Sequence, residues 1–169
     1  MKHSTSRTAR QVQHLLLATI GMLIPVYAFS MIENLGFAGF LSSPIAGALS
    51  IIYSITILAV WNKQKNLPEL PKVPCISHKA TICFAFVLAF CWFSATGATI
   101  GITVTWFQSP DWGTTLAGRT VLPAFEAASD FIQAILFVVL GFKIIKARNE
   151  FLNNPEVCLA PPLSVWRNY

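Results

Sequence analysis

The stretch from Ala80 to Phe107 contains no charged side chain, and it limits what this chain can fold into more than any other feature of the sequence. An α-helix rises about 1.5 Å per residue, and the hydrocarbon core of a bilayer is about 30 Å thick. About 20 consecutive apolar residues are therefore enough to cross a membrane, and this stretch is longer. The sequence predicts a membrane-spanning helix over residues 80–107, which crosses with some tilt or with one end at the interface.

The composition also indicates a membrane protein. Charged residues make up 11% of the chain and hydrophobic residues 54%, and the mean hydropathy is +0.60. Soluble domains carry about 25% charged residues. The polar segments of this 169-residue chain are too short to fold alone, so one compact domain is favoured. The predicted fold class is all-α: an integral membrane four-helix bundle with short loops.

Three further apolar runs complete the predicted bundle. The first is longer than the apolar core of a signal peptide, which has about 7 to 15 residues, and is expected to be a retained signal-anchor span bent at Pro25. Ser43 is suited to cap the second run, and Pro44 is suited to its first turn. The predicted spans cover residues 15–32, 44–61, 80–107 and 121–142 of a four-span domain at 15–146, between a mobile N-terminal tail at 1–14 and an irregular C-terminal tail at 147–169.

Lysine and arginine are distributed unevenly between the predicted spans. Of the 12, three lie in the N-terminal tail, four between the second and third spans and four after the fourth, and only Arg119 lies on the other side. Because cytoplasmic segments carry the Lys/Arg excess, both termini and the middle loop are predicted to be cytoplasmic, in the plasma membrane or an endomembrane. The net charge of +5 follows from this asymmetry, and it indicates contact with anionic lipid headgroups rather than nucleic acid.

Small residues gather on one face of the 80–107 helix. Ser94, Gly97, Ala98 and Gly101 fall within one sector of the helix, and the two glycines form a GxxxG pattern. Such a face lets another helix approach closely in lipid. The sequence predicts that this face packs inside the bundle, and association with a second copy of the chain is the alternative.

The polar residues that stand out lie in the fourth apolar run. Glu126 and Asp130 are one helical turn apart, Gln133 follows in the same sector, and Arg119 precedes them on the same face. Charges within the hydrocarbon cost several kcal/mol, so this candidate intramembrane polar site is expected to face the bundle interior, a water-filled cavity or a partner. Three roles remain open: hydrogen bonding to Ser or Thr of another span, an ion or proton pathway, and a polar contact with a partner protein.

The sequence contains no recognisable catalytic arrangement. His3, His14 and His78 all lie on the predicted cytoplasmic side, away from Glu126 and Asp130. There is no HExxH, no GxSxG and no glycine-rich phosphate loop. An active site needs convergent groups, so the chain is predicted to have no enzymatic activity and no cofactor or metal.

The four cysteines form no CxxC pair and no cluster with histidine. Cys83 and Cys91 lie within the 80–107 run, whereas Cys75 and Cys158 lie in polar segments. The favoured interpretation is that all four are small buried or interfacial residues. Juxtamembrane palmitoylation of Cys75 or Cys158 is the alternative.

Four spans, short outer loops, cytoplasmic termini and a basic middle loop together resemble the MARVEL-type four-span membrane proteins, particularly the small fungal members. The resemblance covers about residues 10–150. It rests on layout rather than on a motif, so it assigns no functional residue. Tetraspanins and claudins match less well, because the cysteine patterns of their outer loops are missing. The resemblance implies a non-enzymatic role in organising membrane regions, vesicle traffic or membrane apposition.

The sequence thus leaves two functions from different classes. The first is an organising protein whose partners are the lipid bilayer, including sterol or anionic lipids, and a second copy of the chain or another membrane protein. The alternative is a small transporter or channel component that uses Glu126 and Asp130. A continuous polar cavity that reaches both acids favours transport, whereas tight packing around Gly97 and Gly101 favours a scaffold.

Overall fold

The chain folds into four long α-helices. The computed structural model describes residues 7–32, 42–65, 78–107 and 116–153, apart from a few side chains near the helix ends, and every structural statement below concerns these residues. The helices are α1 (Arg7–Ile32), α2 (Ser42–Lys65), α3 (Lys79–Phe107) and α4 (Leu116–Asn153). No strand occurs in the part of the chain that the structure describes, so the predicted all-α class is confirmed.

Each helix contains a segment that is long and apolar enough to cross a membrane. The mean hydropathy of these segments lies between 1.3 and 1.9. Even α2, with 24 residues, is about 36 Å long, which exceeds the roughly 30 Å of hydrocarbon in a bilayer. The fold is therefore consistent with a multi-pass membrane protein. The segments are Arg10–Ala28, Ser43–Lys63, Lys79–Thr105 and Pro123–Glu150.

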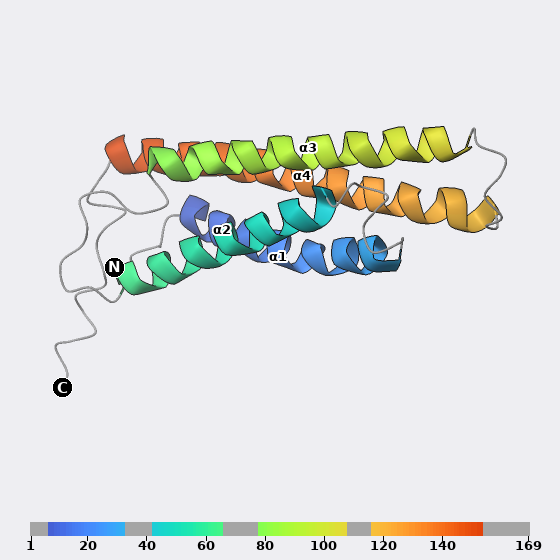
Figure 1. Cartoon of the computed structure of the whole chain (residues 1–169). Coiled ribbons are helices and arrows are strands. Elements are labelled where there is room, and N and C mark those ends of the chain that lie inside the picture. Colours follow the sequence, from blue (N-terminus) through green and yellow to red (C-terminus); the bar gives the residue numbers. More distant parts are fainter. Residues whose placement is uncertain (1–6, 33–41, 66–77, 108–115, 154–169) are drawn as a thin grey trace.

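Consecutive helices alternate in direction along the bundle (Figure 1). α1 packs against α2 and α4, and α3 packs against α2 and α4. The rings of Phe93 and Phe131 meet edge-on between α3 and α4, with centroids 5.9 Å apart. The Lys143 ammonium of α4 donates to the Gln11 side chain of α1 at 2.9 Å. The first turns of α1 and α3 lie at the end of the bundle where α2 and α4 finish (Figure 1).

The helices extend beyond the predicted spans, and the extension is largest for α1 and α4. α1 begins at Arg7 rather than at residue 15, and α4 runs from Leu116 to Asn153 rather than from 121 to 142. The predicted irregular tails are therefore helical over residues 7–14 and 147–153, and this part of the prediction is wrong. The rest of both tails lies outside the described part of the chain.

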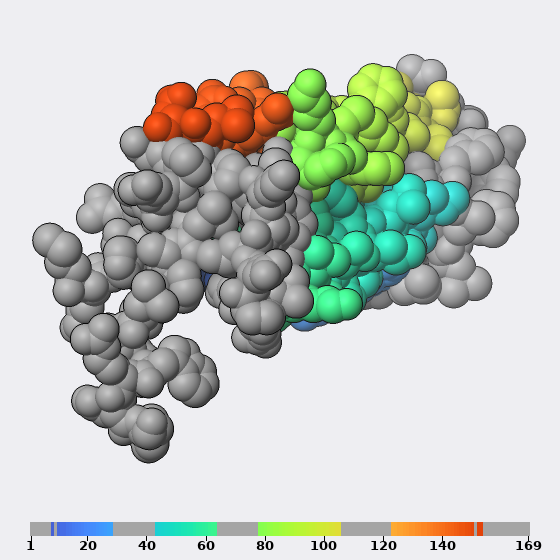
Figure 2. Space-filling model, turned by 90° about the vertical axis from the view of Figure 1, so that its left-hand side faces the viewer, coloured from blue at the N-terminus to red at the C-terminus, as the bar shows by residue number. Residues whose placement is uncertain are grey.

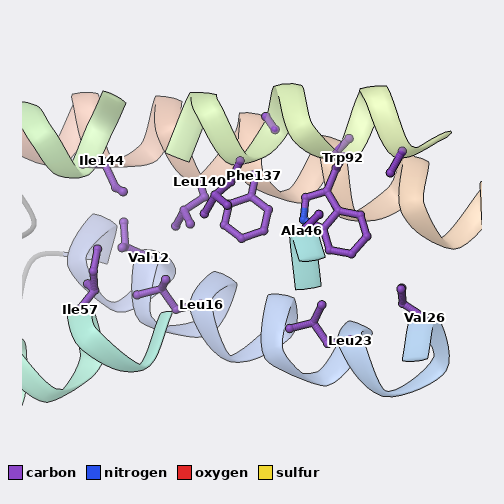
Figure 3. Packing of buried hydrophobic residues seen from close by; sticks show 14 residues of the cluster. Val12, Leu16, Leu23, Val26, Ala46, Ile57, Trp92, Phe137, Leu140 and Ile144 are labelled. Carbon is purple, nitrogen blue, oxygen red and sulfur yellow. The ribbon is translucent and has the colours of Figure 1, made fainter. Parts of the chain in front are cut away.

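The helices extend because the first turns of α1 pack on the last turns of α4. The Thr8 hydroxyl donates to the Glu150 carboxylate at 2.8 Å. Val12 is fully buried and faces Ile144 (Figure 3). Thr8, Val12 and Leu16 recur every four residues, which is the spacing that buries one face of a helix. Polar residues between them lower the hydropathy of this segment, so a search for apolar runs starts the span too late.

The apolar core runs along the inside of the bundle, and the large side chains that α4 contributes to it lie in the half that contains the start of α1. Phe137, Leu140 and Ile144 of α4 have no exposed surface and pack with Leu16 and its neighbours in α1 (Figure 3). The ring of Phe137 also meets the ring of Tyr53 of α2 edge-on, with centroids 6.1 Å apart. Side chains from three helices therefore meet around the second half of α4.

Two glycines lie where an aromatic ring rests on the helix backbone. A Cβ added at Gly47 of α2 would lie 2.8 Å from the hydroxyl oxygen of Tyr27 of α1. A Cβ added at Gly141 of α4 would lie 2.9 Å from the ring of Phe86 of α3. The Tyr27 hydroxyl donates to the Pro44 carbonyl at 3.0 Å, which holds this ring over Gly47. The close approach of both helix pairs therefore requires the absence of a side chain at these glycines.

The small-residue face of α3 points away from the other helices. Ser94, Gly97 and Gly101 are exposed, and Ala98 is half-buried. Nothing among the described residues lies within 4 Å of a Cβ added at Gly97 or Gly101. The prediction that this face packs inside the bundle is therefore wrong for the part of α3 that the structure describes. The tight packing around Gly97 and Gly101 that would favour a scaffold is therefore not observed within the described bundle. Association of this face with a second copy of the chain stays a prediction.

The rotation of α3 follows from Trp92. This side chain is fully buried, and its indole N–H donates to the Ser50 hydroxyl of α2 at 2.9 Å. A buried indole N–H without an acceptor is costly, whereas Gly97 and Gly101 carry no side-chain polar group that needs a partner. Residues 92 and 97 are about 140° apart around a helix, so burying Trp92 turns the glycines outward.

Candidate functional site

The first half of α4 carries the polar side chains that the sequence singled out. Glu126, Asp130 and Gln133 each have no exposed surface. Measured from Pro123, where the apolar segment begins, Asp130 lies about 10 Å along the helix. Of the three environments that the sequence allows, the structure places these side chains in the bundle interior. Arg119 belongs to the same helix, but its side chain lies outside the described residues.

Asp130 bonds across the bundle to α2. The Ser43 hydroxyl donates to Asp130 Oδ2 at 2.7 Å, and Ser43 is itself fully buried. This is the kind of bond expected if Asp130 has a structural role, since its partner is a serine of another span. Ser43 is the second residue of α2, which begins at Ser42. It lies near the helix start, where the sequence predicted a cap, and its hydroxyl donates to the Asp130 carboxylate. Pro44 lies in the first turn of α2, as predicted.

Gln133 bonds to α1. Its amide nitrogen donates to the Thr19 carbonyl at 3.0 Å, and the Thr19 hydroxyl donates to the Leu16 carbonyl at 2.8 Å. The Thr19 hydroxyl also lies 3.4 Å from the Ser54 hydroxyl of α2. A hydroxyl has one hydrogen, so Ser54 is the donor of this contact. Gln133 thus connects α4 to α1, and Thr19 connects α1 to α2.

The fourth connection runs from α3 to α2. Ser50 accepts the indole N–H of Trp92 and donates its own hydrogen to the Ala46 carbonyl at 2.7 Å. The close-up shows Trp92 beside Ala46 (Figure 3). Together these bonds join all four helices through buried side chains. We call this set the buried polar network: Thr19, Ser43, Ser50, Ser54, Trp92, Asp130 and Gln133.

Some oxygens in this region accept no hydrogen bond from the described residues. They are Asp130 Oδ1, Gln133 Oε1 and the hydroxyl oxygen of Thr99, and all three side chains are fully buried. These atoms are hard oxygen acceptors, the kind that bind protons, water or hard cations. In the described residues, however, no group of three or more His, Cys, Asp or Glu side chains lies together to hold a metal ion.

The remaining candidates lie elsewhere. His14 of α1 is exposed, and His78, also exposed, immediately precedes α3; both therefore lie at the end opposite the first half of α4. His3, Cys75 and Cys158 lie outside the described residues. Cys83 is exposed and Cys91 is half-buried, and neither forms a disulfide. The structure thus brings none of the described histidines or cysteines to the buried acids.

The sequence analysis missed the hydroxyls of α2. Ser43, Ser50 and Ser54 lie on one helical face together with Ala46 and Gly47, and all five are buried. The pairs Ser43/Gly47, Ala46/Ser50 and Ser50/Ser54 each have the small-xxx-small spacing of membrane helix contacts. This signal was available in the sequence. It differs from the GxxxG of α3 in that each of its three pairs contains a hydroxyl that requires a buried partner.

Comparison with known proteins adds no functional assignment. No protein-family model, no curated protein and no solved structure matches this chain. The function therefore has to be argued from the geometry of the bundle and of its buried polar network.

Proposed function

We propose that this chain is a non-enzymatic multi-pass membrane protein that organises a membrane region or partner proteins, as its resemblance to MARVEL-type proteins implies. The observation that supports this most directly is the use of the buried polar side chains. Asp130 bonds to Ser43 of α2, and Gln133 bonds to the backbone of Thr19 of α1. Groups that bond to other helices serve to fix the helices relative to one another.

In this proposal both termini and the connection between α2 and α3 are cytoplasmic, in the plasma membrane or an endomembrane. The support is that the described basic side chains of all four helices lie at one end of the bundle. Cytoplasmic segments carry the Lys/Arg excess in membrane proteins. Single cysteines placed near Lys65 and near Trp112, in an otherwise cysteine-free chain, are expected to react with an impermeant reagent from opposite sides.

The outer surface of the bundle fits the same role. Large apolar side chains are exposed on every helix, for example Ile24 at 74%, Ile52 at 63%, Phe90 at 72% and Phe142 at 61%. Such side chains are suited to contact lipid tails or the spans of other membrane proteins. The partners we propose are accordingly the bilayer itself, including sterol, and a second copy of the chain or another membrane protein.

Neutral isosteres test the proposal. Glu126→Gln and Asp130→Asn together retain side-chain volume and an acceptor for Ser43 while they remove ionisable groups from the interior. We expect the double variant to reach the same membrane as the native chain and to retain its neighbours in proximity labelling. Loss of localisation or neighbours in a variant that remains folded would contradict a purely structural use of these acids and would favour their contact with a partner protein.

A second function is favoured by one observation. Asp130 Oδ1 and Gln133 Oε1 accept no hydrogen bond from the described residues, although both side chains are buried. A proton or cation pathway needs such acceptors within the hydrocarbon. A small transporter or channel component is therefore the alternative. Vesicles reconstituted with the native chain are expected to show no proton or sodium flux; a flux that the double isostere abolishes would favour this alternative.

A further inference from the structure

Basic side chains from all four helices lie at one end of the bundle, where α1 and α3 begin and α2 and α4 finish. Figure 1 shows these helix ends together, and Figure 2 shows the end of α4 (red) beside the start of α3 (green). Four of them are exposed, and Lys143 and Arg148 are half-buried. We call this set the basic collar: Arg10, Lys63, Lys79, Lys143, Lys146 and Arg148. Among the described residues of this end, Glu150 is the one acidic side chain, and it accepts the hydroxyl of Thr8.

The depth of the basic collar is set by the apolar segments. Arg10 is the first residue of the segment in α1, Lys63 the last in α2, and Lys79 the first in α3. Lys146 and Arg148 lie near the end of the segment in α4, which finishes at Glu150. In a helix that crosses a bilayer, residues at the limits of the apolar segment lie at the level of the lipid headgroups. The collar charges of all four helices therefore reach the headgroup region of the same leaflet.

Packing also orients one of these side chains. Lys143 donates to Gln11 at 2.9 Å across the contact between α4 and α1, which holds its ammonium at the surface. Long basic side chains at membrane interfaces commonly pack their aliphatic stems while the charged group reaches water, and the half-burial of Lys143 and Arg148 is consistent with this arrangement. The collar therefore has a fixed ammonium on α4 and additional charges on all four helices.

The opposite end of the bundle provides the contrast. In the apolar segments, the described side chains of that half include no lysine or arginine, and the acids Glu126 and Asp130 are fully buried. The described surface there offers apolar and hydroxyl groups to the headgroups. Among the side chains that the structure describes, those that can attract anionic lipid therefore lie at the basic collar and in one leaflet.

We propose that the basic collar binds the headgroups of anionic phospholipids, so that the protein collects these lipids around one end of its bundle. The charges come from four helices placed around the bundle, so they are suited to several singly charged headgroups rather than to one multiply charged ligand. Their depth at the limits of the apolar segments favours lipid over soluble phosphate. This rests on the proposed membrane-spanning function, and it names the lipid class that the protein would organise.

The experiment compares lipid preference in the full chain. The protein is reconstituted in phosphatidylcholine bilayers that contain spin-labelled phosphatidylserine or spin-labelled phosphatidylcholine, and the motionally restricted fraction of each label is measured. We expect the serine lipid to be restricted several-fold more strongly, and we expect this preference to fall as salt shortens the Debye length from about 10 Å at 0.1 M to about 3 Å at 1 M. Inorganic phosphate is expected to compete no better than sodium chloride of the same ionic strength.

A charge-neutral variant with a matched control assigns the preference to the collar. Arg10→Gln, Lys63→Gln and Lys146→Gln together change three exposed side chains on three helices, and we expect them to lower the preference at least twofold. Arg119→Gln, which removes one charge from the other end of α4, is expected to leave it unchanged. Each single collar variant should lower the preference in part, so a triple variant that fails to fold does not prevent the test.

The outcomes are separable. Equal restriction of the two lipids by the native chain, or a triple variant with native preference, would overturn the lipid proposal and leave the organising function in place. A preference for soluble phosphate over chloride would assign the collar to a phosphate ligand instead of lipid. Cysteine labelling that shows no membrane crossing would remove the proposed function and this inference together.

Discussion

The two halves of the inner face of α4 are equally buried, but different interactions hold them. In the first half, Asp130 and Gln133 have no exposed surface and bond to α2 and α1. In the second half, Phe137 and Leu140 have no exposed surface either, and the contacts are between rings and aliphatic groups. Lipid tails are as apolar as leucine, so burial alone provides little force between helices in a membrane.

This difference shows that the two halves of α4 place different requirements on their side chains. The second half depends on shape, because the ring of Phe86 rests on Gly141 and the ring of Phe137 meets that of Tyr53. The first half depends on the pairing of donors and acceptors, because a buried polar group without a partner is costly. Changes in volume should therefore be most damaging near Gly141, and changes in hydrogen-bonding capacity near Asp130.

The largest effect is expected from Phe137→Ala. This ring is fully buried among three helices, and removing it leaves an enclosed cavity that lipid tails do not fill. Buried phenylalanines replaced by alanine typically cost about 3–5 kcal/mol, and we expect a loss of unfolding free energy on this scale. Denaturant unfolding in mixed micelles, followed by circular dichroism, measures it.

Phe90→Ala is the matched control for this prediction. Phe90 is 72% exposed on the outer face of α3, so its replacement exchanges contacts with lipid or detergent and opens no cavity. We expect its unfolding free energy to stay within about 0.5 kcal/mol of the native value. Similar losses for the two variants would show that the second half of α4 is not closely packed.

The second prediction compares glycines. In Gly141→Leu the new side chain meets the ring of Phe86, and in Gly47→Leu it meets Tyr27, whereas the space beside Gly97 is open in the described residues. Overpacking costs about 1–3 kcal/mol, so we expect losses on this scale for Gly141→Leu and Gly47→Leu. Thermal unfolding in detergent measures all three variants.

Gly97→Leu distinguishes packing within one bundle from association between two bundles. It should leave the thermal stability of the single chain nearly unchanged, because its side chain projects outward. If the exposed face of α3 contacts a second copy, the same substitution should reduce crosslinking between chains in the native membrane. A loss of stability in Gly97→Leu as large as that in Gly141→Leu would contradict the observed orientation of α3.

The sequence determined the number and type of helices because apolar length is a property of each run on its own. The start of α1 was missed because Val12 and Leu16 are separated by polar residues, which lower the hydropathy of the segment. The inward orientation of the Glu126, Asp130 and Gln133 side chains was predictable, because charges are costly in lipid. These inferences need only one helix at a time.

The rotation of α3 and the partners of the acids required the structure. Trp92 faces inward because Ser50 of α2 accepts its indole N–H, and no property of α3 alone identifies that acceptor. Hydrogen bonding of Asp130 to a serine or threonine of another span was one of the three roles left open, but Ser43, its observed partner, was considered only as a helix cap. Which side chains bond between two helices depends on the relative depth and rotation of those helices. The length of an apolar run and its periodicity do not give this information.

The third prediction tests the polar half with a matched pair of serines. Ser43→Ala removes the donor to Asp130 Oδ2, whereas Ser94→Ala removes an exposed hydroxyl that bonds to the Phe90 carbonyl of its own helix. We expect Ser43→Ala to lower the unfolding free energy by about 1–2 kcal/mol. The change in Ser94→Ala should stay within about 0.5 kcal/mol. Chemical denaturation in micelles compares the two, and equal effects would show that the bond to Asp130 adds nothing to stability.

The smallest effect is expected from Trp92→Phe, which removes one hydrogen bond between α3 and α2. A smaller phenyl ring replaces the indole, and Ser50 still donates to the Ala46 carbonyl at 2.7 Å, so this substitution leaves no hydroxyl hydrogen without an acceptor. Single hydrogen bonds between membrane helices average about 0.6 kcal/mol, and the smaller ring leaves some space at this buried position, so we expect a loss of about 1 kcal/mol. Ser50→Ala breaks the same bond from the other side, but it leaves the buried indole N–H without its acceptor. Its cost in the same unfolding assay should therefore be larger than that of Trp92→Phe, and the reverse order would show that the fit of the indole, rather than its hydrogen bond, holds α3 against α2.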